Sequence, residues 1–174
     1  NWLDVVFNDQ ALLHSYDLSM RRATDKMNYY VSGSFYDQDG IAQGSTFRRY
    51  NMRANTDVKA SKWLRVGTNA MIVFEEVQQA EDGEYALYSP ISASRFMLPY
   101  WNPYREDGTI ASEKDGSWKG TGQNPLEWME NNQQFNKKFK TLATLFAEVT
   151  PIKDLAIRTQ VGADFTNSTA FMQS

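Results

Sequence analysis

Residues 48–59 alternate apolar and polar side chains almost without interruption, and this alternation constrains the fold more than any other feature of the sequence. Successive side chains of a β-strand point to opposite faces, so such a segment forms a strand with one apolar face and one polar face. The apolar set is Tyr50, Met52, Ala54, Thr56 and Val58, and the polar set is Arg49, Asn51, Arg53, Asn55 and Asp57.

Six segments follow the same period of two and are predicted to be strands. They span residues 14–22, 28–36, 48–59, 63–76, 139–150 and 155–165. The fifth is apolar at both parities around residues 142–149, which leaves its orientation open. The pattern predicts an all-β chain in which about six strands form an antiparallel up-and-down meander.

The connections between these strands alternate in length. Residues 24–26, 60–62 and 151–154 form short turns, whereas 37–46 is longer and 77–137 is very long. Outer-membrane barrels have tight turns at one end and long loops at the other, while a soluble sandwich has no reason to separate them in this way. We therefore expect 77–137 to be a long extracellular loop.

The long loop contains signs of local structure. Short helical turns are predicted at residues 91–96 and 125–131. Asn124 is positioned to cap the second one, because Pro125 suits the first helical position and Glu127 falls in the first turn. A loop of this length with its own structure is often functional.

Composition narrows the classes of protein without choosing among them. No run of about 18 apolar residues exists, which excludes a transmembrane helix but not a membrane-spanning barrel. The formal net charge of −3 gives no basic surface for nucleic acid. Alternation alone leaves two environments open, because the apolar face suits either a soluble core or lipid.

Several stretches resemble one family, the SusC/RagA-like TonB-dependent transporters of Bacteroidetes outer membranes. The most specific is NYYVSGSFYDQDGI at residues 28–41. Residues 2–7, 14–19, 47–55, 63–69 and 155–165 resemble neighbouring strands of the same barrel, in order and at plausible spacing.

The resemblance implies a barrel of about 22 strands with a plugged lumen, located in the outer membrane of a Gram-negative cell. Such a protein imports a nutrient, often a glycan or peptide, beneath a SusD-like surface lipoprotein and with energy from the TonB complex. The chain would supply about a quarter of that barrel, and neither a plug nor a TonB-contacting segment is recognisable in it. Asn1 is not an initiator methionine and no signal segment follows it, so we expect an internal piece of a longer protein. The alternative function is a soluble β-rich carbohydrate-binding module.

Two sets of candidate site residues follow from these expectations. The polar faces of the strands would line the lumen, with Arg49, Asn51, Arg53, Asn55, Asp57, Arg65, Asn69, Arg158 and Gln160 as candidates. Flat aromatic rings and neighbouring amides in the long loop would contact a ligand or pack internally, with Tyr100, Trp101, Asn102, Tyr104, Trp118 and Trp128 as candidates.

Metal, cofactor and catalytic chemistry are not expected, so the chain is interpreted as a non-enzyme. His14 is the only histidine and there is no cysteine. The run 37–40 resembles the start of a calcium loop, but Arg48 occupies the twelfth position, so a polar turn with Gly40 at positive φ is the expected structure. The acids Glu75, Glu76, Glu81, Asp82 and Glu84 are interpreted as a solvated rim rather than as a glycosidase pair.

Overall fold

The computed structural model describes residues 1–80 and 89–173. Within them lie three short helices and six strands. The elements are α1 (Trp2–Val6), β1 (Leu13–Ala23), β2 (Met27–Asp39), β3 (Thr46–Lys59), β4 (Leu64–Ala80), α2 (Pro90–Phe96), α3 (Pro125–Asn131), β5 (Gln133–Ile152) and β6 (Leu155–Gln173).

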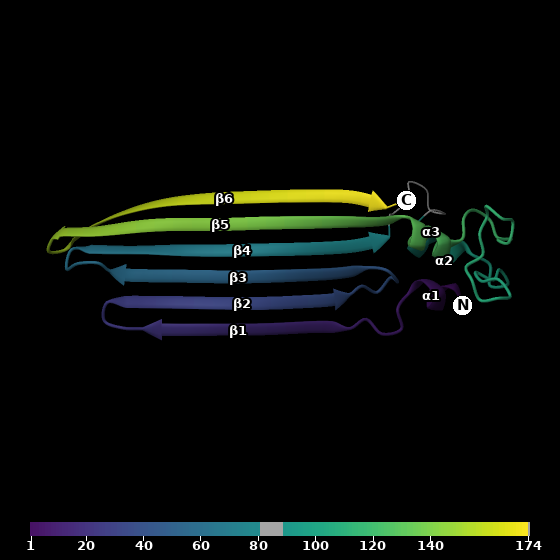
Figure 1. Cartoon of the computed structure of the whole chain (residues 1–174), viewed down its shortest axis with the longest axis horizontal. Coiled ribbons are helices and arrows are strands. Elements are labelled where there is room, and N and C mark those ends of the chain that lie inside the picture. Colours follow the sequence, from purple (N-terminus) through teal and green to yellow (C-terminus); the bar gives the residue numbers. More distant parts are fainter. Residues whose placement is uncertain (81–88, 174) are drawn as a thin grey trace.

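The strands form one antiparallel sheet in the order β1-β2-β3-β4-β5-β6, so the predicted six-stranded meander is confirmed. The sheet is open, with β1 and β6 as its two edges (Figure 1). Most strands are longer than the alternating pattern indicated, above all β5 and β6: β5 begins at Gln133 rather than near residue 139, and β6 continues to Gln173 rather than ending near residue 165. The connection between β4 and β5 is correspondingly shorter than 77–137, because β4 ends at Ala80 and β5 begins at Gln133.

The short turns and the long connections lie at opposite ends of the sheet (Figure 1). The β1–β2 turn is closed by Thr24, whose backbone N–H donates to the Met27 carbonyl at 2.8 Å. The predicted turn at 151–154 is shorter than expected, because β5 includes Ile152 and Asp154 adopts a positive φ of 67°. A register shift between Val149 and Ile152 admits Pro151 next to this turn.

The three helices gather beyond the long-connection end and form a cap over it (Figure 1). The helices predicted at 91–96 and 125–131 are confirmed as α2 and α3, whereas α1 was not predicted. The buried hydrophobic side chains among the described residues all belong to this cap except Phe146 of β5. None of the helices in the described part of the chain combines the length and apolar character needed to span a bilayer.

Candidate functional site

One face of the sheet is an exposed apolar band. Cross-strand partners share a face, so the register places the even-numbered residues of β3 together with the apolar residues of every other strand. Its large side chains are exposed: Leu18 is 80% exposed, Met52 62% and Val161 68%. The packed interior that a free-standing soluble β domain would need on this face is therefore missing among the described residues.

An aromatic row crosses the apolar face near the cap. Tyr16, Phe35, Tyr50, Phe74 and Phe139 are directly paired across five neighbouring strands. The first four rings follow one another at centroid distances of 6.3, 5.0 and 6.2 Å. Such a row is typical of the aromatic girdle at one boundary of a membrane-spanning apolar band.

A charged row follows immediately beyond the aromatic row, on the same face and nearer the cap. Asp37, Arg48, Glu76 and Lys137 are paired in register across β2, β3, β4 and β5. Arg48 Nε lies 3.1 Å from Asp37 Oδ1, and Lys137 Nζ lies 3.0 Å from Glu76 Oε1. Along β3, for example, the face changes from apolar Met52 through aromatic Tyr50 to charged Arg48 within four residues.

The height of the apolar band can be compared with that of outer-membrane barrels. Ten residues separate Phe74 in the aromatic row from Leu64 at the turn end of β4. At about 3.4 Å per residue this is roughly 34 Å along the strand. At the strand tilt of about 40° found in outer-membrane barrels, this length would correspond to roughly 26 Å along the membrane normal, close to the apolar height of about 25 Å in such barrels.

The opposite face is polar, and it carries every residue nominated for the lumen. The odd-numbered residues of β3 and β4 share this face with the even-numbered residues of β5 and β6. The nominated residues are Arg49, Asn51, Arg53, Asn55, Asp57, Arg65, Asn69, Arg158 and Gln160. The carboxamide oxygen of Asn51 is buried there and has no hydrogen-bond partner among the described residues.

Near the turn end, the polar face holds a compact charged network. The Arg65 guanidinium donates two hydrogen bonds to the Asp57 carboxylate and lies 3.8 Å from Glu148 Oε1. The Arg158 guanidinium sits over the ring of Phe146, with Cζ 4.1 Å from the ring centroid. Both cations are thereby compensated and directed along the sheet surface.

Phe146 also explains a glycine in β4. It is 9% exposed although it lies on the polar face, because its ring covers Gly67. A Cβ at Gly67 would come within 2.3 Å of the Phe146 ring and 2.6 Å of the Thr56 carbonyl oxygen. The missing side chain thus makes room for an aromatic ring that β5 could otherwise not accommodate.

The cap is built around Asn124. Its side chain is fully buried, and its Oδ1 accepts the Leu126 backbone N–H at 3.1 Å, which confirms the predicted helix cap. Its Nδ2 donates to the carbonyl oxygens of Pro103 and Ala111, each at 2.8 Å. One carboxamide therefore joins the start of α3 to two distant points of the loop, with every hydrogen bond buried.

The hydrophobic core of the cap involves the beginning of the chain. Trp2 and Trp118 meet edge to face with centroids 5.7 Å apart, and the Trp2 indole N–H donates to the Leu98 carbonyl at 3.0 Å. Val6, Leu126 and Met129 form a second buried cluster beside them. Because α1 supplies part of both clusters, the loop is held in shape by residues that precede the sheet.

The connection between β2 and β3 joins the same cap, but not through the turn that was predicted. The Gln43 N–H donates to the Val6 carbonyl at 2.9 Å, and Asn8 Nδ2 donates to the Gly40 carbonyl at 2.7 Å. The expectation of a positive φ at Gly40 is wrong, because the left-handed residue is Gly44, with φ 73°. Gly40 is needed for a different reason: a Cβ there would collide with Ser45 Oγ.

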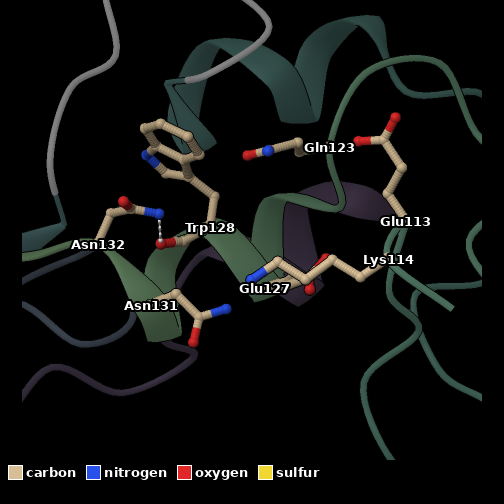
Figure 2. A pocket seen from close by; sticks show the side chains of 7 residues that line it. All are labelled: Glu113, Lys114, Gln123, Glu127, Trp128, Asn131 and Asn132. Carbon is tan, nitrogen blue, oxygen red and sulfur yellow. Dashed lines mark hydrogen bonds between the residues drawn. The ribbon is translucent and has the colours of Figure 1, made fainter. Parts of the chain in front are cut away.

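A pocket of about 390 Å³ opens on the side of α3 that faces away from the cap core. Its lining is polar apart from one indole, as Figure 2 shows. The lining residues are Glu113, Lys114, Gln123, Glu127, Trp128, Asn131 and Asn132. We call it the α3 pocket.

The loop aromatics nominated as ligand contacts divide between several places. Tyr100, Trp101, Asn102 and Tyr104 line a second hollow of about 290 Å³ together with residues of α1. Trp118 is 6% exposed, and its indole N–H donates to the Gly122 carbonyl, so it packs inside the cap. Trp128 alone of the six lines the α3 pocket.

Two aspartates order the loop between these hollows. The pKa of Asp107 lies below its ordinary value, mainly because the Thr109 hydroxyl and backbone N–H donate to its carboxylate. The pKa of Asp115 is lowered in the same way by Ser117, and Arg105 also pairs with Asp115. Both carboxylates are therefore favoured in their charged form.

The remaining chemical candidates form no second site within the part of the chain that the structure describes. Glu81, Asp82 and Glu84 lie outside the described residues, and Glu76 belongs to the charged row of the sheet. Within residues 1–80 and 89–173, no group of three or more metal-ligating side chains comes together.

Comparisons with known proteins find similarity to TonB-dependent receptors and to a peptide importer. No family model matches it. It is 28% identical over 173 residues to TonB-dependent receptor P26 of Formosa agariphila, covering 97% of this chain and 16% of that protein. TonB-dependent receptor P3 of the same organism is 27% identical over 113 residues, covering 63% of this chain and 11% of that protein. The chain is related to the TonB-dependent receptors.

Solved structures extend this relationship to the fold. The RagAB peptide importer in its open-open state matches with a TM-score of 0.77 and 27% identity, over 97% of this chain and 19% of the importer chain. Its closed-closed state matches with a TM-score of 0.76 and 24% identity. The predicted resemblance of this chain to SusC/RagA-like transporters is confirmed, and the chain spans less than a fifth of the length of each relative.

Sequence reasoning missed most of the polar residues around Trp128. Asn131 and Asn132 follow α3, and Glu113 with Lys114 stand ten or more residues before it. The only local signal was the amphipathic character of 125–131, in which one side carries Leu126 and Met129. The polar side of that helix could have indicated that a pocket lies next to it.

Proposed function

We propose that the chain is a segment of a SusC-type, TonB-dependent importer that carries a nutrient across the outer membrane of a Gram-negative cell. The observation that supports this most is the exposed apolar band, bounded by an aromatic row and a charged row and backed by a polar face. That arrangement suits lipid on one side and a watery lumen on the other.

The open sheet is proposed to be part of a closed barrel of about 22 strands. Closure removes exposed strand edges, and β1 and β6 each present one. The six strands would make up about a quarter of the barrel wall, and the polar-face residues from Arg49 to Gln160 would line the lumen. A plug inside that lumen would also offer a donor to the buried oxygen of Asn51.

The cap is proposed to lie on the extracellular side, where the long connections of outer-membrane barrels are found. There it would face a SusD-like surface lipoprotein and the incoming glycan or peptide. The RagAB importer is a peptide importer by name, which supports nutrient import as the class. The TonB complex would act through parts of the parent protein other than this segment.

The alternative of a soluble carbohydrate-binding module is not favoured. A soluble domain would bury Tyr50, Met52 and Ile157 in a core, yet these side chains are 45%, 62% and 54% exposed. The named relatives are receptors and importers rather than enzymes, so transport rather than turnover is the expected activity.

Cell fractionation of the full-length parent protein tests the proposal. We expect it in the outer-membrane fraction, resistant to extraction by salt and released by detergent. Deleting the gene for TonB should abolish growth on the imported nutrient without changing this location. Recovery of the protein in the soluble periplasmic fraction would contradict the proposal.

A further inference from the structure

The α3 pocket is lined by one side of a helix whose other side is packed in the cap core. Helix α3 buries Pro125, Leu126 and Met129 on one side and presents Glu127, Trp128 and Asn131 to the cavity on the other. Its volume of about 390 Å³ falls in the lower part of the range of roughly 300–1,000 Å³ occupied by small-ligand sites.

Hydrogen bonds hold the walls of this pocket in place before any ligand arrives. The Ser112 hydroxyl donates to Glu127 Oε1, which fixes the segment carrying Glu113 and Lys114 against α3. The Asn132 side chain donates to the Trp128 carbonyl at 3.2 Å (Figure 2). With Asn124 anchoring the other end of α3, little ordering remains to oppose binding.

The lining matches the hydrogen-bonding pattern of sugar hydroxyls. Gln123, Asn131 and Asn132 each offer an amide that both donates and accepts, and the two glutamates add acceptors. Neighbouring hydroxyls on a pyranose ring also donate and accept in pairs. The indole of Trp128 supplies the one extended apolar surface, and Figure 2 shows the Gln123 amide extending toward it.

The charge of the lining argues against an acidic ligand. Glu113 and Glu127 carry two negative charges and Lys114 one positive charge, so the pocket has an excess of one negative charge. A uronate or sulfate group entering it would meet like charge and lose water without full compensation. A neutral sugar avoids that cost.

The same lining argues against a peptide. Peptide sites usually provide an open strand edge or several apolar side-chain pockets. The α3 pocket offers a helix side and a single aromatic residue, surrounded by polar groups. A hydroxyl-rich ring satisfies more of these groups than a peptide segment of the same size.

We propose that the α3 pocket is a subsite for one neutral hexose unit of a glycan, with the ring against Trp128 and its hydroxyls bonded to Asn131, Asn132 and Gln123. This proposal deepens the proposed importer function and rests on it. It assigns glycan rather than peptide to this particular site.

The test uses the purified full-length parent protein in detergent and immobilised probes of defined chemistry. The probes are hexasaccharides of neutral glucan, mannan and galactan, the hexasaccharide of polygalacturonate, and random decapeptides. We expect at least one neutral hexasaccharide to bind. Trp128→Ala should raise its dissociation constant at least about tenfold, and Asn131→Ala about threefold or more.

Two features of the design keep the variants interpretable. Asn131 is exposed, so its truncation leaves the fold of the cap unchanged, and Trp128→Phe should restore part of the binding lost in Trp128→Ala. Phe96→Ala is the matched control, because it removes an exposed aromatic ring of the cap outside the α3 pocket. It should leave binding unchanged.

Each other outcome overturns the inference. It fails if no neutral hexasaccharide binds, if binding survives both pocket variants, or if polygalacturonate or peptides are the probes whose binding depends on Trp128. The importer function fails separately, through soluble location or independence from TonB. If the protein is an outer-membrane importer but its cargo binding does not depend on the α3 pocket, the proposed function stands and the proposed subsite is wrong.

Discussion

The sheet and the cap differ in where their apolar side chains lie. In the cap, α1, α2 and α3 bury Trp2, Trp118 and Asn124 in a small core of their own. In the sheet, long strands pair in continuous register while large apolar side chains stay exposed. The cap is thus stabilised by its own buried core, whereas the proposed membrane location would supply the apolar surroundings that one face of the sheet lacks.

A charge placed on the apolar face of the sheet should lower the unfolding free energy more than any other change considered. Met20→Arg lies in the central row of the band, where a lipid-facing arginine costs about 2–4 kcal/mol of unfolding free energy. Ser19→Arg is the matched control, because the neighbouring residue of β1 points to the polar face and should change stability by less than about 0.5 kcal/mol. Urea unfolding of the full-length protein in lipid vesicles measures both, and equal effects would show that the faces do not differ in environment.

Removing the anchor of the cap should loosen that region alone. Asn124→Ala deletes the α3 cap and removes the side-chain hydrogen bonds to the carbonyl groups of Pro103 and Ala111, of which Pro103 keeps the bond from the Ala111 N–H, and this should lower the local opening free energy by about 2–3 kcal/mol. Hydrogen exchange of peptides covering residues 89–132 should accelerate, while exchange in β3 stays unchanged.

Two further variants sharpen that result. Asn124→Asp keeps the helix-capping oxygen but not the two donors, so it should lose part of the stability. Asn131→Ala, an exposed amide on the same helix, should leave exchange as it is. If β3 exchanged faster in Asn124→Ala as well, the cap and the sheet would be one cooperative unit rather than two.

Within the sheet, adding one methyl group at Gly67 should show whether close side-chain packing contributes to stability there. Gly67→Ala would drive a Cβ into the Phe146 ring and the Thr56 carbonyl, and we expect a loss of about 1–2 kcal/mol. Gly33→Ala on β2 is the control, since its nearest neighbour would lie 3.9 Å away. Thermal unfolding of the two variants should separate them, and equal melting temperatures would mean that Phe146 does not depend on Gly67.

As the pH is lowered, the cap should lose stability at a higher pH than the parts of the sheet that have no ion pairs. Of the effects predicted, this is the smallest. The pKa values of Asp107 and Asp115 are lower in the folded loop than in an unfolded chain, where 3.8 is the ordinary value. Their contribution to stability is therefore complete above that value and is lost as the pH falls through the lower folded values. Hydrogen exchange of residues 105–117 between pH 5 and about pH 2 should show the change, and Asp115→Asn should reduce it.

The sheet could be predicted from the sequence because each strand shows its alternating pattern within its own residues. Period-two alternation in 48–59 and 155–165 identified both the strands and their faces. It failed around 142–149, where Leu142 and Phe146 occupy the polar face although they are apolar. Phe146 lies there because Gly67, nearly eighty residues earlier in the chain, leaves room for it, and no local pattern contains that fact.

The cap was predictable only in fragments, because long-range contacts build it. Asn124 followed by Pro125 and Glu127 was enough to place α3, yet the bonds from Asn124 to Pro103 and Ala111 depend on loop packing. Helix α1 is five residues long and has no stability of its own without the core that it joins. The α3 pocket depends on both and so escaped prediction except for Trp128.

Accessibility measured along β3 shows directly whether the apolar face meets lipid while the polar face meets water. The chain contains no cysteine, so single cysteines can be introduced at each position from 48 to 58 and labelled with a nitroxide in the full-length protein in lipid bilayers. We expect collisions with lipid-soluble oxygen to dominate at Tyr50, Met52 and Ala54, and collisions with a water-soluble nickel complex to dominate at Arg49, Asn51 and Arg53. Equal access of the nickel complex to both sets would contradict this expectation.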